Sequence, residues 1–566
     1  MDLENVLRKL GKYGIWQIGV YVMWAFAFNI PYVFNALALV FIGSRPISYH
    51  CTVGENETFL LEGNGKPSMC SMYRNSSFDN TTVSCQNGWT YANHEEFGST
   101  IVTEFDLVCD KSYLSELSQT LYVMGETIGS ILITPLADVY GRKRVHLICQ
   151  FFLAACTVIQ SFSVNYIMFV LLRVANGMFL SGVVLTAIVA AIEMFPMEMR
   201  TLAGQLFFVW WAGAMMFMDL LAYFIRDWRH LQLALGLIPF TSMIGFWLCP
   251  ESVPWLLANG KVEKAEKIVK QAAKLNRVEL PEHPFHQSIV TEEKEPEPEP
   301  EPEPKDNEPK IQKVKPCALA SEDARNCFML ISHPLLRRIF LIMLSLWFVN
   351  NIVYYGITFM SPSLTDSKYL NFFLSALAEL PACLTCILTL ERFGRRKPLC
   401  FFHCLAGGAL LILIFVPDKT ADGTSLMWLI MTLTFIAKFA ITGSFNALIQ
   451  FTMEVYPTNQ RNTGLGLSSM TGRMSGMIAP FTIPLVKMMP WVPFFLFAVM
   501  SITVGIAAML LPETLYYPLP QTVEEMETWD VPTVNGLINS CLCRDKKTHK
   551  KNNPEQMPMT KDVSYV

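Results

Sequence analysis

Two short stretches decide the fold of this chain: Asp138-Val-Tyr-Gly-Arg-Lys143 and Glu391-Arg-Phe-Gly-Arg-Arg396. In each, an acid is followed three residues later by a glycine and then by two bases, and each lies between two long apolar runs. A basic turn between two apolar segments is typical of the cytoplasmic end of a pair of membrane helices. Its recurrence in the second part of the chain predicts an internal duplication.

Two further pairs of signatures recur in the same order. They are Glu193-Met-Phe-Pro196 with Arg200 and Glu454-Val-Tyr-Pro457 with Arg461, then Pro250-Glu-Ser252 and Pro512-Glu-Thr514. Because matching signatures fall at corresponding ends of apolar runs, a parallel duplication is favoured over coincidence.

The composition agrees with a chain that is largely surrounded by lipid. Of the 566 residues 52% are hydrophobic and 16% are charged, against roughly 25% charged in soluble domains. Twelve runs have the roughly 20 residues that a helix needs to cross a bilayer. They are Ile15–Ile42, Tyr113–Leu136, Val145–Val164, Tyr166–Ile192, Leu202–Ile225, Leu231–Leu248, Ile339–Met360, Tyr369–Leu390, Pro398–Val416, Leu426–Phe451, Thr463–Leu485 and Val492–Leu511.

Basic residues in the short loops set the orientation. They follow the second, fourth and eighth runs: Arg142, Lys143, Arg144, Arg200, Arg392, Arg395, Arg396 and Lys397. The positive-inside rule places these loops in the cytoplasm. Residues 1–14, 250–338 and 512–566 are then cytoplasmic, residues 15–249 and 339–511 form the two six-helix halves, and residues 43–112 form an extracellular loop.

The outer loop has the features of an oxidised, glycosylated segment. It contains four cysteines and three N-glycosylation sequons: Cys51, Cys70, Cys85 and Cys109, and Asn56, Asn75 and Asn80. Four cysteines allow three pairings, and the sequence does not choose among them. In the central cytoplasmic stretch, Glu295–Pro304 alternates Glu and Pro, which predicts an extended spacer without chemistry of its own.

These motifs resemble those of the major facilitator superfamily. The loop signature Gly-x-x-x-Asp-x-x-Gly-Arg-Lys is matched from Asp138 onward, with Thr134 in place of the first glycine, and Arg173-Val-Ala-Asn-Gly177 resembles the superfamily's Arg-x-x-x-Gly. The resemblance implies an all-α membrane protein with twelve transmembrane helices in two six-helix halves.

Within that superfamily the chain resembles the organic cation, anion and carnitine transporter family. The motifs that carry this resemblance are Ser99–Glu104, Leu107–Cys109, Ala222–Trp228, Pro250-Glu-Ser with Trp255-Leu-Leu, and Pro512-Glu-Thr-Leu. It implies a plasma-membrane transporter of small organic ions, with no enzymatic activity, cofactor or metal. Organic anions or zwitterions are favoured over the alternative of an organic cation or carnitine-type substrate.

The resemblance also implies a charge-paired cytoplasmic latch that forms in the outward-open state and releases in the inward-open state. Its expected members lie at the ends of the second, fourth, eighth and tenth helices and just after them: Asp138, Gly141, Arg142, Glu193, Arg200, Glu391, Arg395, Glu454 and Arg461. The alternative is that these charges only enforce topology.

Ionisable residues within the apolar runs mark the candidate substrate site, because each is costly in the bilayer. Arg473 lies among small residues in the eleventh run, and at this position the family resemblance implies Arg in anion and carnitine transporters. An Arg can hold a carboxylate through two parallel hydrogen bonds. Glu379 in the eighth run could hold the positive end of a zwitterion, although a permanent Arg473–Glu379 pair is the structural alternative. Glu126 is either a proton-coupling acid or a structural one, and Lys438 is expected to pair helices.

The seventh run offers an aromatic wall for a flat organic ion. Trp347, Asn351 and Tyr354 recur at helical spacing and share one face, and the family resemblance places pocket residues there. A lipid-facing aromatic belt is the alternative.

Other function classes are less favoured. The sequence shows neither the filter of a channel nor the nucleophile and base of an enzyme, and it has no ATP-binding loop. A receptor without transport remains open. The terminal Ser564, Tyr565 and Val566 match the short carboxylate-ended motif that a PDZ scaffold binds.

Overall fold

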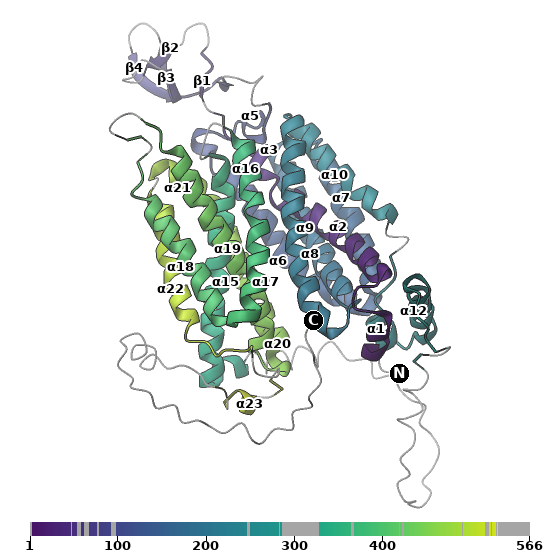
Figure 1. Cartoon of the computed structure of the whole chain (residues 1–566). Coiled ribbons are helices and arrows are strands. Elements are labelled where there is room, and N and C mark those ends of the chain that lie inside the picture. The colour runs from purple at the N-terminus through teal and green to yellow at the C-terminus, as the bar shows by residue number, and fades with distance from the viewer. Residues whose placement is uncertain are drawn as a thin grey trace, which may run out of the picture.

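The computed structural model describes residues 3–46, 48–53, 58–61, 67–75, 79–91, 98–245, 249–281, 284–285, 328–363, 367–417, 419–420, 424–489, 491–515, 520–521, 523–527 and 529. Figure 1 shows two helical bundles side by side, with the N-terminal half in purple to blue and the C-terminal half in green to yellow. The Glu295–Pro304 spacer, Asn56 and the tail motif Ser564–Val566 lie outside the described residues.

Each half contains one helix, or a pair of consecutive helices, for every predicted run. The N-terminal half has α2 (Ile15–Ala36) with α3 (Leu39–Ile42), then α6 (Leu114–Tyr140), α7 (Arg142–Gln160), α8 (Tyr166–Ile192), α9 (Met197–Phe224) and α10 (Trp228–Gly245). The C-terminal half has α15 (Pro334–Met360), α16 (Lys368–Leu377) with α17 (Glu379–Phe393), α18 (Arg396–Leu413), α19 (Met427–Val455), α20 (Thr458–Ile478) and α22 (Trp491–Ala508). The 3-10 turn η3 (Ala479–Phe481) and α21 (Thr482–Met488) follow α20.

Within the described residues, nine helical spans are long and apolar enough to cross a membrane. The other predicted crossings correspond to α7, α10 and α20. Helix α7 begins with three bases, α10 has Arg229, His230 and Gln232 near its start, and α20 contains Arg461 and Arg473 among serines, threonines and glycines. These helices are therefore less apolar than their neighbours, although they complete the same two bundles.

Close backbone contact joins α6 to α8. A Cβ atom added to Gly125 would lie 2.2 Å from the carbonyl oxygen of Val174, and one added to Gly177 would lie 2.1 Å from that of Tyr122. Only glycine fits at such positions, as is common where membrane helices meet. The glycine of the predicted Arg173–Gly177 signature thus has a packing role.

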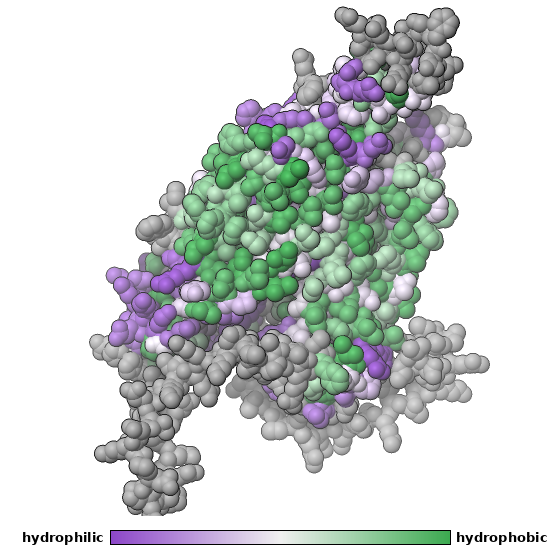
Figure 2. Space-filling model, turned by 180° about the vertical axis from the view of Figure 1, so that it is seen from behind, coloured by the Kyte–Doolittle hydropathy of each residue, from purple (hydrophilic) through white to green (hydrophobic). Residues whose placement is uncertain are grey.

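The exterior of the bundles is apolar in a band. Figure 2 shows green, hydrophobic residues across the middle of the molecule, with purple, hydrophilic residues gathered at both ends. Large exposed side chains such as Leu171, Leu388 and Phe415 are 65%, 70% and 79% exposed. Such a band is the surface expected of a protein whose helices are solvated by lipid.

The outer loop forms two small antiparallel sheets, which the sequence analysis did not predict. One pairs β1 (Tyr49–Cys51) with β5 (Trp89–Tyr91), and the other has the order β2 (Thr58–Leu61), β3 (Pro67–Asn75), β4 (Asp79–Ser84). Of the predicted glycosylation sites, Asn75 ends β3 and Asn80 lies in β4.

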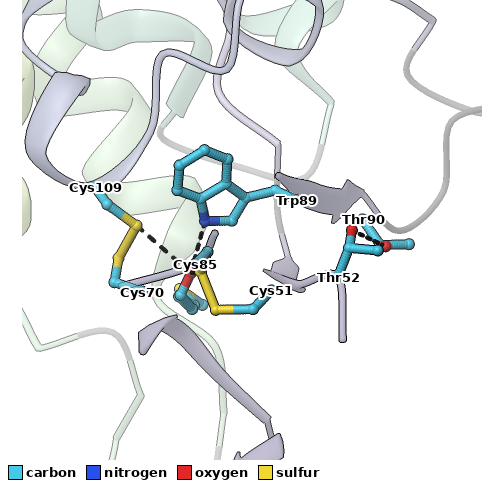
Figure 3. The surroundings of a disulfide bond; sticks show 8 residues. Cys51, Thr52, Cys70, Cys85, Trp89, Thr90 and Cys109 are labelled. Atoms are coloured by element: carbon cyan, nitrogen blue, oxygen red, sulfur yellow. Dashed lines mark hydrogen bonds between the residues drawn. A yellow bond between two sulfur atoms is a disulfide. The ribbon is translucent and has the colours of Figure 1, made fainter. Parts of the chain in front are cut away.

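Two disulfides fix this loop. Of the three possible pairings, the structure forms Cys51–Cys85 and Cys70–Cys109. Figure 3 shows both bonds near Trp89, whose indole donates a hydrogen bond of 3.2 Å to the carbonyl of Met69. The crosslinks tie both sheets to the start of the second membrane helix.

A polar clamp holds the end of the outer loop on the N-terminal half. The short helix α5 (Ile101–Glu104) ends at Glu104, which forms an ion pair with Arg229 and accepts a hydrogen bond of 2.6 Å from the Trp228 indole. Beside it, burial tends to raise the pKa of Asp227. Hydrogen bonds from Ser99 and from two backbone N–H groups outweigh burial, so the pKa of Asp227 lies below its ordinary value.

The segments that are predicted to be cytoplasmic also pack against the N-terminal half. Helices α11 (Val253–Ala258) and α12 (Val262–Asn276) share an apolar core with α1 (Leu3–Leu10). The side chain of Asn276 accepts a hydrogen bond of 3.0 Å from the backbone N–H of Trp16 at the start of α2. These helices lie at the end of the molecule opposite the strands (Figure 1).

Candidate transport site

A small cavity lies between the two halves. Its volume is about 90 Å³. The N-terminal half lines one side with Phe28, Asn29, Tyr32, Ile188, Phe207, Phe208 and Trp211. The C-terminal half lines the other side with Tyr354, Tyr355, Glu379, Thr442, Phe445 and Asn446. Aromatic walls with a few polar tips suit small organic ligands.

The halves contact each other on both sides of this cavity. Toward the predicted cytoplasmic end, the Gln205 amide of α9 donates a hydrogen bond of 3.2 Å to the carbonyl of Asn446 in α19. Toward the predicted extracellular end, Thr120 of α6 donates a hydrogen bond of 2.7 Å to the carbonyl of Met477 in α20. The cavity is therefore bounded at both ends by contacts that must break when the halves separate.

Glu379 pairs with Lys438 rather than with Arg473. The Lys438 Nζ lies 2.9 Å from the Glu379 Oε1, and both side chains are almost fully buried. Lys438 also donates a hydrogen bond of 2.6 Å to the hydroxyl of Thr358. The structure thus gives Lys438 of α19 the helix-pairing position that the sequence suggested.

A helix break explains where Glu379 lies. Helix α16 ends at Leu377, and Glu379 is the first residue of α17. A carboxylate in the first turn of a helix is stabilised by the helix dipole and by free backbone N–H groups. The break therefore allows one buried acid to sit at the cavity wall.

Tyr354 connects Glu379 to the other half of the protein. Its hydroxyl donates a hydrogen bond of 2.7 Å to the Glu379 carboxylate and accepts one of 2.8 Å from the Trp211 indole. The Lys438 Nζ lies 3.4 Å from the centroid of the Tyr354 ring. This chain of contacts crosses from α9 to α15, so separation of the halves breaks the Trp211–Tyr354 hydrogen bond and leaves Tyr354 with Glu379.

Arg473 faces the opposite half and pairs with Glu126. The Arg473 Nε lies 3.7 Å from the Glu126 Oε1, across the contact between α20 and α6. This distance is too long for a hydrogen bond. Residues Tyr32 and Tyr355 line the cavity and lie within electrostatic range of both members of the pair.

Of the predicted aromatic face, Tyr354 lines the cavity while Trp347 and Asn351 lie behind it. The Trp347 indole donates a hydrogen bond of 3.0 Å to Thr452. The Asn351 amide donates a hydrogen bond of 3.0 Å to the carbonyl of Trp347. It also packs closely against Gly472, since a Cβ atom added to Gly472 would lie 2.4 Å from the Asn351 amide nitrogen. Asn351 therefore supports the helix turn that carries Arg473.

In the N-terminal half the predicted cytoplasmic pair is formed. The Arg142 guanidinium lies 3.0 Å from Glu193 and 3.8 Å from Asp138. Glu193 also accepts a hydrogen bond from the Ser252 hydroxyl. Burial raises the pKa of Glu193, and the Ser252 hydrogen bond and the Arg142 charge partly oppose this rise.

The C-terminal half repeats the arrangement. Arg395 lies 2.9 Å from Glu454, which accepts a hydrogen bond of 2.6 Å from Thr514. Both motif pairs thus join helices of one half, and neither crosses to the other half. Glu391 is exposed, and its side chain forms no ion pair or hydrogen bond within the described part of the chain.

Two acids outside the predicted latch contact the same two motif turns. The Glu251 carboxylate accepts a hydrogen bond of 3.0 Å from the backbone N–H of Lys143, and Glu513 accepts one of 2.8 Å from that of Arg395. They approach Gly141 and Gly394, whose φ angles are +100° and +85°. The repeated Pro-Glu-Ser and Pro-Glu-Thr motifs were the signal for this role.

The remaining two arginines of the predicted latch have other partners. Arg200 lies 3.3 Å from Glu4 in α1 and donates a hydrogen bond of 3.1 Å to the carbonyl of Phe195. Arg461 donates the equivalent bond, of 3.4 Å, to the carbonyl of Tyr456. Each arginine thus binds a carbonyl in the turn that precedes its own helix, and the two halves again match.

Comparisons with known proteins agree with this architecture. The family described as "Sugar (and other) transporter" matches residues 68–527. An organic cation transporter protein of Drosophila melanogaster is 32% identical over 548 residues, which cover 94% of this chain and 95% of the relative. The organic cation/carnitine transporter 2 of Rattus norvegicus is 29% identical, covering 93% of this chain and 94% of its own.

The solved structures that resemble this chain have the same fold. The xylose transporter XylE from E. coli in its inward-open conformation aligns with a TM-score of 0.55 at 14% identity, covering 91% of this chain and 98% of the transporter. Its partially occluded inward-open conformation gives 0.56 at 12% identity, covering 89% and 98%. Likeness at this level of identity establishes the fold alone.

Two bundles of membrane helices around a cavity with buried charges define a multi-pass membrane transporter. The chain belongs to the organic cation, anion and carnitine transporter family of the major facilitator superfamily. The predicted all-α facilitator fold is confirmed, and the protein is a transporter and not an enzyme.

Proposed function

We propose that this protein carries small organic ions with a carboxylate group, either anions or zwitterions, across the plasma membrane by alternating access. The observation that carries the proposal is the state of Arg473. Its side chain is 20% exposed, and within the described residues its one ion pair, to Glu126, is 3.7 Å long. A substrate carboxylate can offer this guanidinium the two short hydrogen bonds that Glu126 does not form.

The size of the cavity supports alternating access. A volume of about 90 Å³ is well below the roughly 300–1,000 Å³ of typical ligand sites. The two halves must therefore separate on one side to admit an organic ion. We assign the Arg142–Glu193 and Arg395–Glu454 pairs to the charge-paired latch at the predicted cytoplasmic helix ends, which we expect to form in the outward-open state and to release in the inward-open state.

A second candidate is an organic cation. The cavity has one carboxylate in its lining, that of Glu379, among aromatic rings, and such rings attract cations through their faces. The relatives named as organic cation transporters favour this alternative as well. Against it, Lys438 already neutralises Glu379 at 2.9 Å, so a cationic substrate would have to displace a buried ammonium.

Uptake into proteoliposomes would separate the candidates. Labelled hippurate, glycine betaine and tetramethylammonium represent an anion, a zwitterion and a cation. Arg473→Ala is expected to reduce uptake of the first two by at least tenfold, because it removes the carboxylate partner. Removal of the exposed cation of Lys270 in α12 by Lys270→Ala is the matched control and should change nothing. Undiminished hippurate and betaine uptake by Arg473→Ala would refute the carboxylate role.

Two peripheral features remain predictions. We propose that Asn56, Asn75 and Asn80 carry glycans and that Ser564 to Val566 bind a PDZ scaffold. Enzymatic deglycosylation should lower the apparent mass. Deletion of the last three residues should reduce retention at the surface of polarised cells and leave transport per surface molecule unchanged.

A further inference from the structure

The Glu126–Arg473 contact differs from the other ion pairs in its position. Among the described residues it is the one ion pair that joins the N-terminal half to the C-terminal half. It connects α6 to α20 beside the cavity, whereas Glu379 and Lys438 both belong to the C-terminal half. Any movement between the halves therefore changes the distance between Glu126 and Arg473.

Arg473 is the cation that faces Glu126. The Glu126 side chain is 8% exposed. The groups that act on it come from α20, which carries Arg473, from α2 and α15, which carry Tyr32 and Tyr355, and from α6 itself, which carries Tyr122. The tyrosine hydroxyls are neutral, so they can share hydrogen bonds with Glu126 but cannot replace a positive charge.

The cation on the neighbouring helix α8 is already occupied. Arg173 donates hydrogen bonds to the carbonyl of Asn35, at 2.8 Å, and to the side chain of Gln119. Its guanidinium also stacks 4.5 Å from the centroid of the Tyr122 ring. Arg173 is therefore fixed by the N-terminal half and is not free to compensate Glu126.

A substrate carboxylate that binds Arg473 takes away the partner of Glu126. A buried carboxylate without a partner is strongly unfavourable, and such a group becomes neutral instead. Glu126 is buried and has one cation as its partner. Binding of a carboxylate to Arg473 is therefore linked to protonation of Glu126.

We propose that Glu126 takes up one proton when a carboxylate binds Arg473, so that each substrate carboxylate crosses the membrane together with one proton. The inference rests on the carboxylate role of Arg473 proposed above. A proton from water forms one O–H bond with the Glu126 carboxylate, and no other bond breaks. On the opposite side the substrate leaves, the proton returns to water, and Glu126 pairs again with Arg473.

The charges balance throughout this cycle. Before binding, Glu126 neutralises Arg473; after binding, the substrate carboxylate neutralises Arg473 while Glu126 is a neutral acid. The charges of Arg473, Glu126 and the substrate carboxylate therefore cancel when the halves move, which avoids the cost of an unbalanced charge in a low-dielectric environment. The cationic group of a zwitterion such as glycine betaine adds one positive charge to this sum. For a simple carboxylate the transported unit, anion plus proton, is also neutral.

Proteoliposomes that contain a trapped pH-sensitive dye test the proposal. Glycine betaine is a suitable probe, because its permanent charge keeps it from crossing the lipid by itself. In the wild-type protein, betaine uptake should acidify the lumen by about one proton per molecule. Glu126→Gln should reduce this ratio to near zero. Asp219→Asn is a matched change of another buried acid, which lies in α9 and has no ion-pair partner among the residues that the structure describes. This variant should keep the wild-type ratio.

Binding measured by scintillation proximity keeps the test valid if a variant transports poorly. Linkage predicts that betaine affinity of the wild type rises by up to about tenfold for each unit by which the pH falls, while Glu126→Gln loses this dependence. Wild-type uptake without proton movement, together with loss of uptake in Arg473→Ala, would overturn the coupling and leave the proposed function standing. Undiminished betaine uptake in Arg473→Ala would instead refute the carboxylate role itself.

Discussion

Removal of the Lys438 charge tests how strongly the buried pair stabilises the C-terminal half. Lys438→Met keeps the length of the side chain and leaves Glu379 without its cation. At the 2.9 Å separation of the two charged atoms, and with an effective dielectric constant near 20, the lost attraction is about 6 kcal/mol. The cost of removing the ammonium from water offsets part of this attraction. We therefore expect the free energy of unfolding to fall by about 3–5 kcal/mol.

The assay is denaturant unfolding in mixed micelles, carried out as a double-mutant cycle. Glu379→Gln added to Lys438→Met should recover a large part of the loss, because the neutral amide needs no cation. Lys267→Met on the exposed face of α12 is the control for removal of a lysine. A single variant as stable as the wild type, or a double variant no more stable than the single one, would refute the reasoning.

Three further changes test other parts of the structure. Gly394→Ala places a Cβ 2.5 Å from the Glu513 carboxylate at a positive φ, so it should destabilise the protein by about 1–3 kcal/mol, as measured by the same unfolding assay. Cys70→Ser should leave the thiol of Cys109 free for labelling by a membrane-impermeant maleimide, while the wild type is not labelled there. Trp211→Phe removes one hydrogen bond between the halves, worth about 0.5–1.5 kcal/mol, and should change the apparent substrate affinity in the binding assay by roughly two- to tenfold.

The helices and their duplication could be predicted because they depend on local patterns. Apolar length identifies a membrane helix, and the two Gly-Arg motifs mark equivalent turns in each half. The pairing of Arg142 with Glu193 and of Arg395 with Glu454 follows the repeat of these motifs. Glu251 and Glu513 also occupy equivalent positions in the repeat. Their contacts are with backbone N–H groups, so no basic side chain in the sequence points to these contacts.

The partners within the membrane could not be predicted, because they depend on how helices rotate and pack. The sequence left open a pair between Arg473 and Glu379, since both are buried ions of opposite sign. The structure instead gives Glu379 to Lys438 and Arg473 to Glu126. The choice is made by the break before Glu379 and by the contact of α20 with α6, and neither is visible in composition or periodicity.

The two buried pairs differ in what movement of the halves does to them. Glu379 and Lys438 lie on helices of one half, so their distance is unaffected when that half moves as a unit, and they can hold Tyr354 in place throughout transport. Glu126 and Arg473 lie on opposite halves, so separation of α6 from α20 breaks their contact. The Glu379–Lys438 pair is therefore fixed, and the Glu126–Arg473 pair is exchangeable. The exchangeable pair leaves Arg473 as the cation to which an incoming carboxylate can bind.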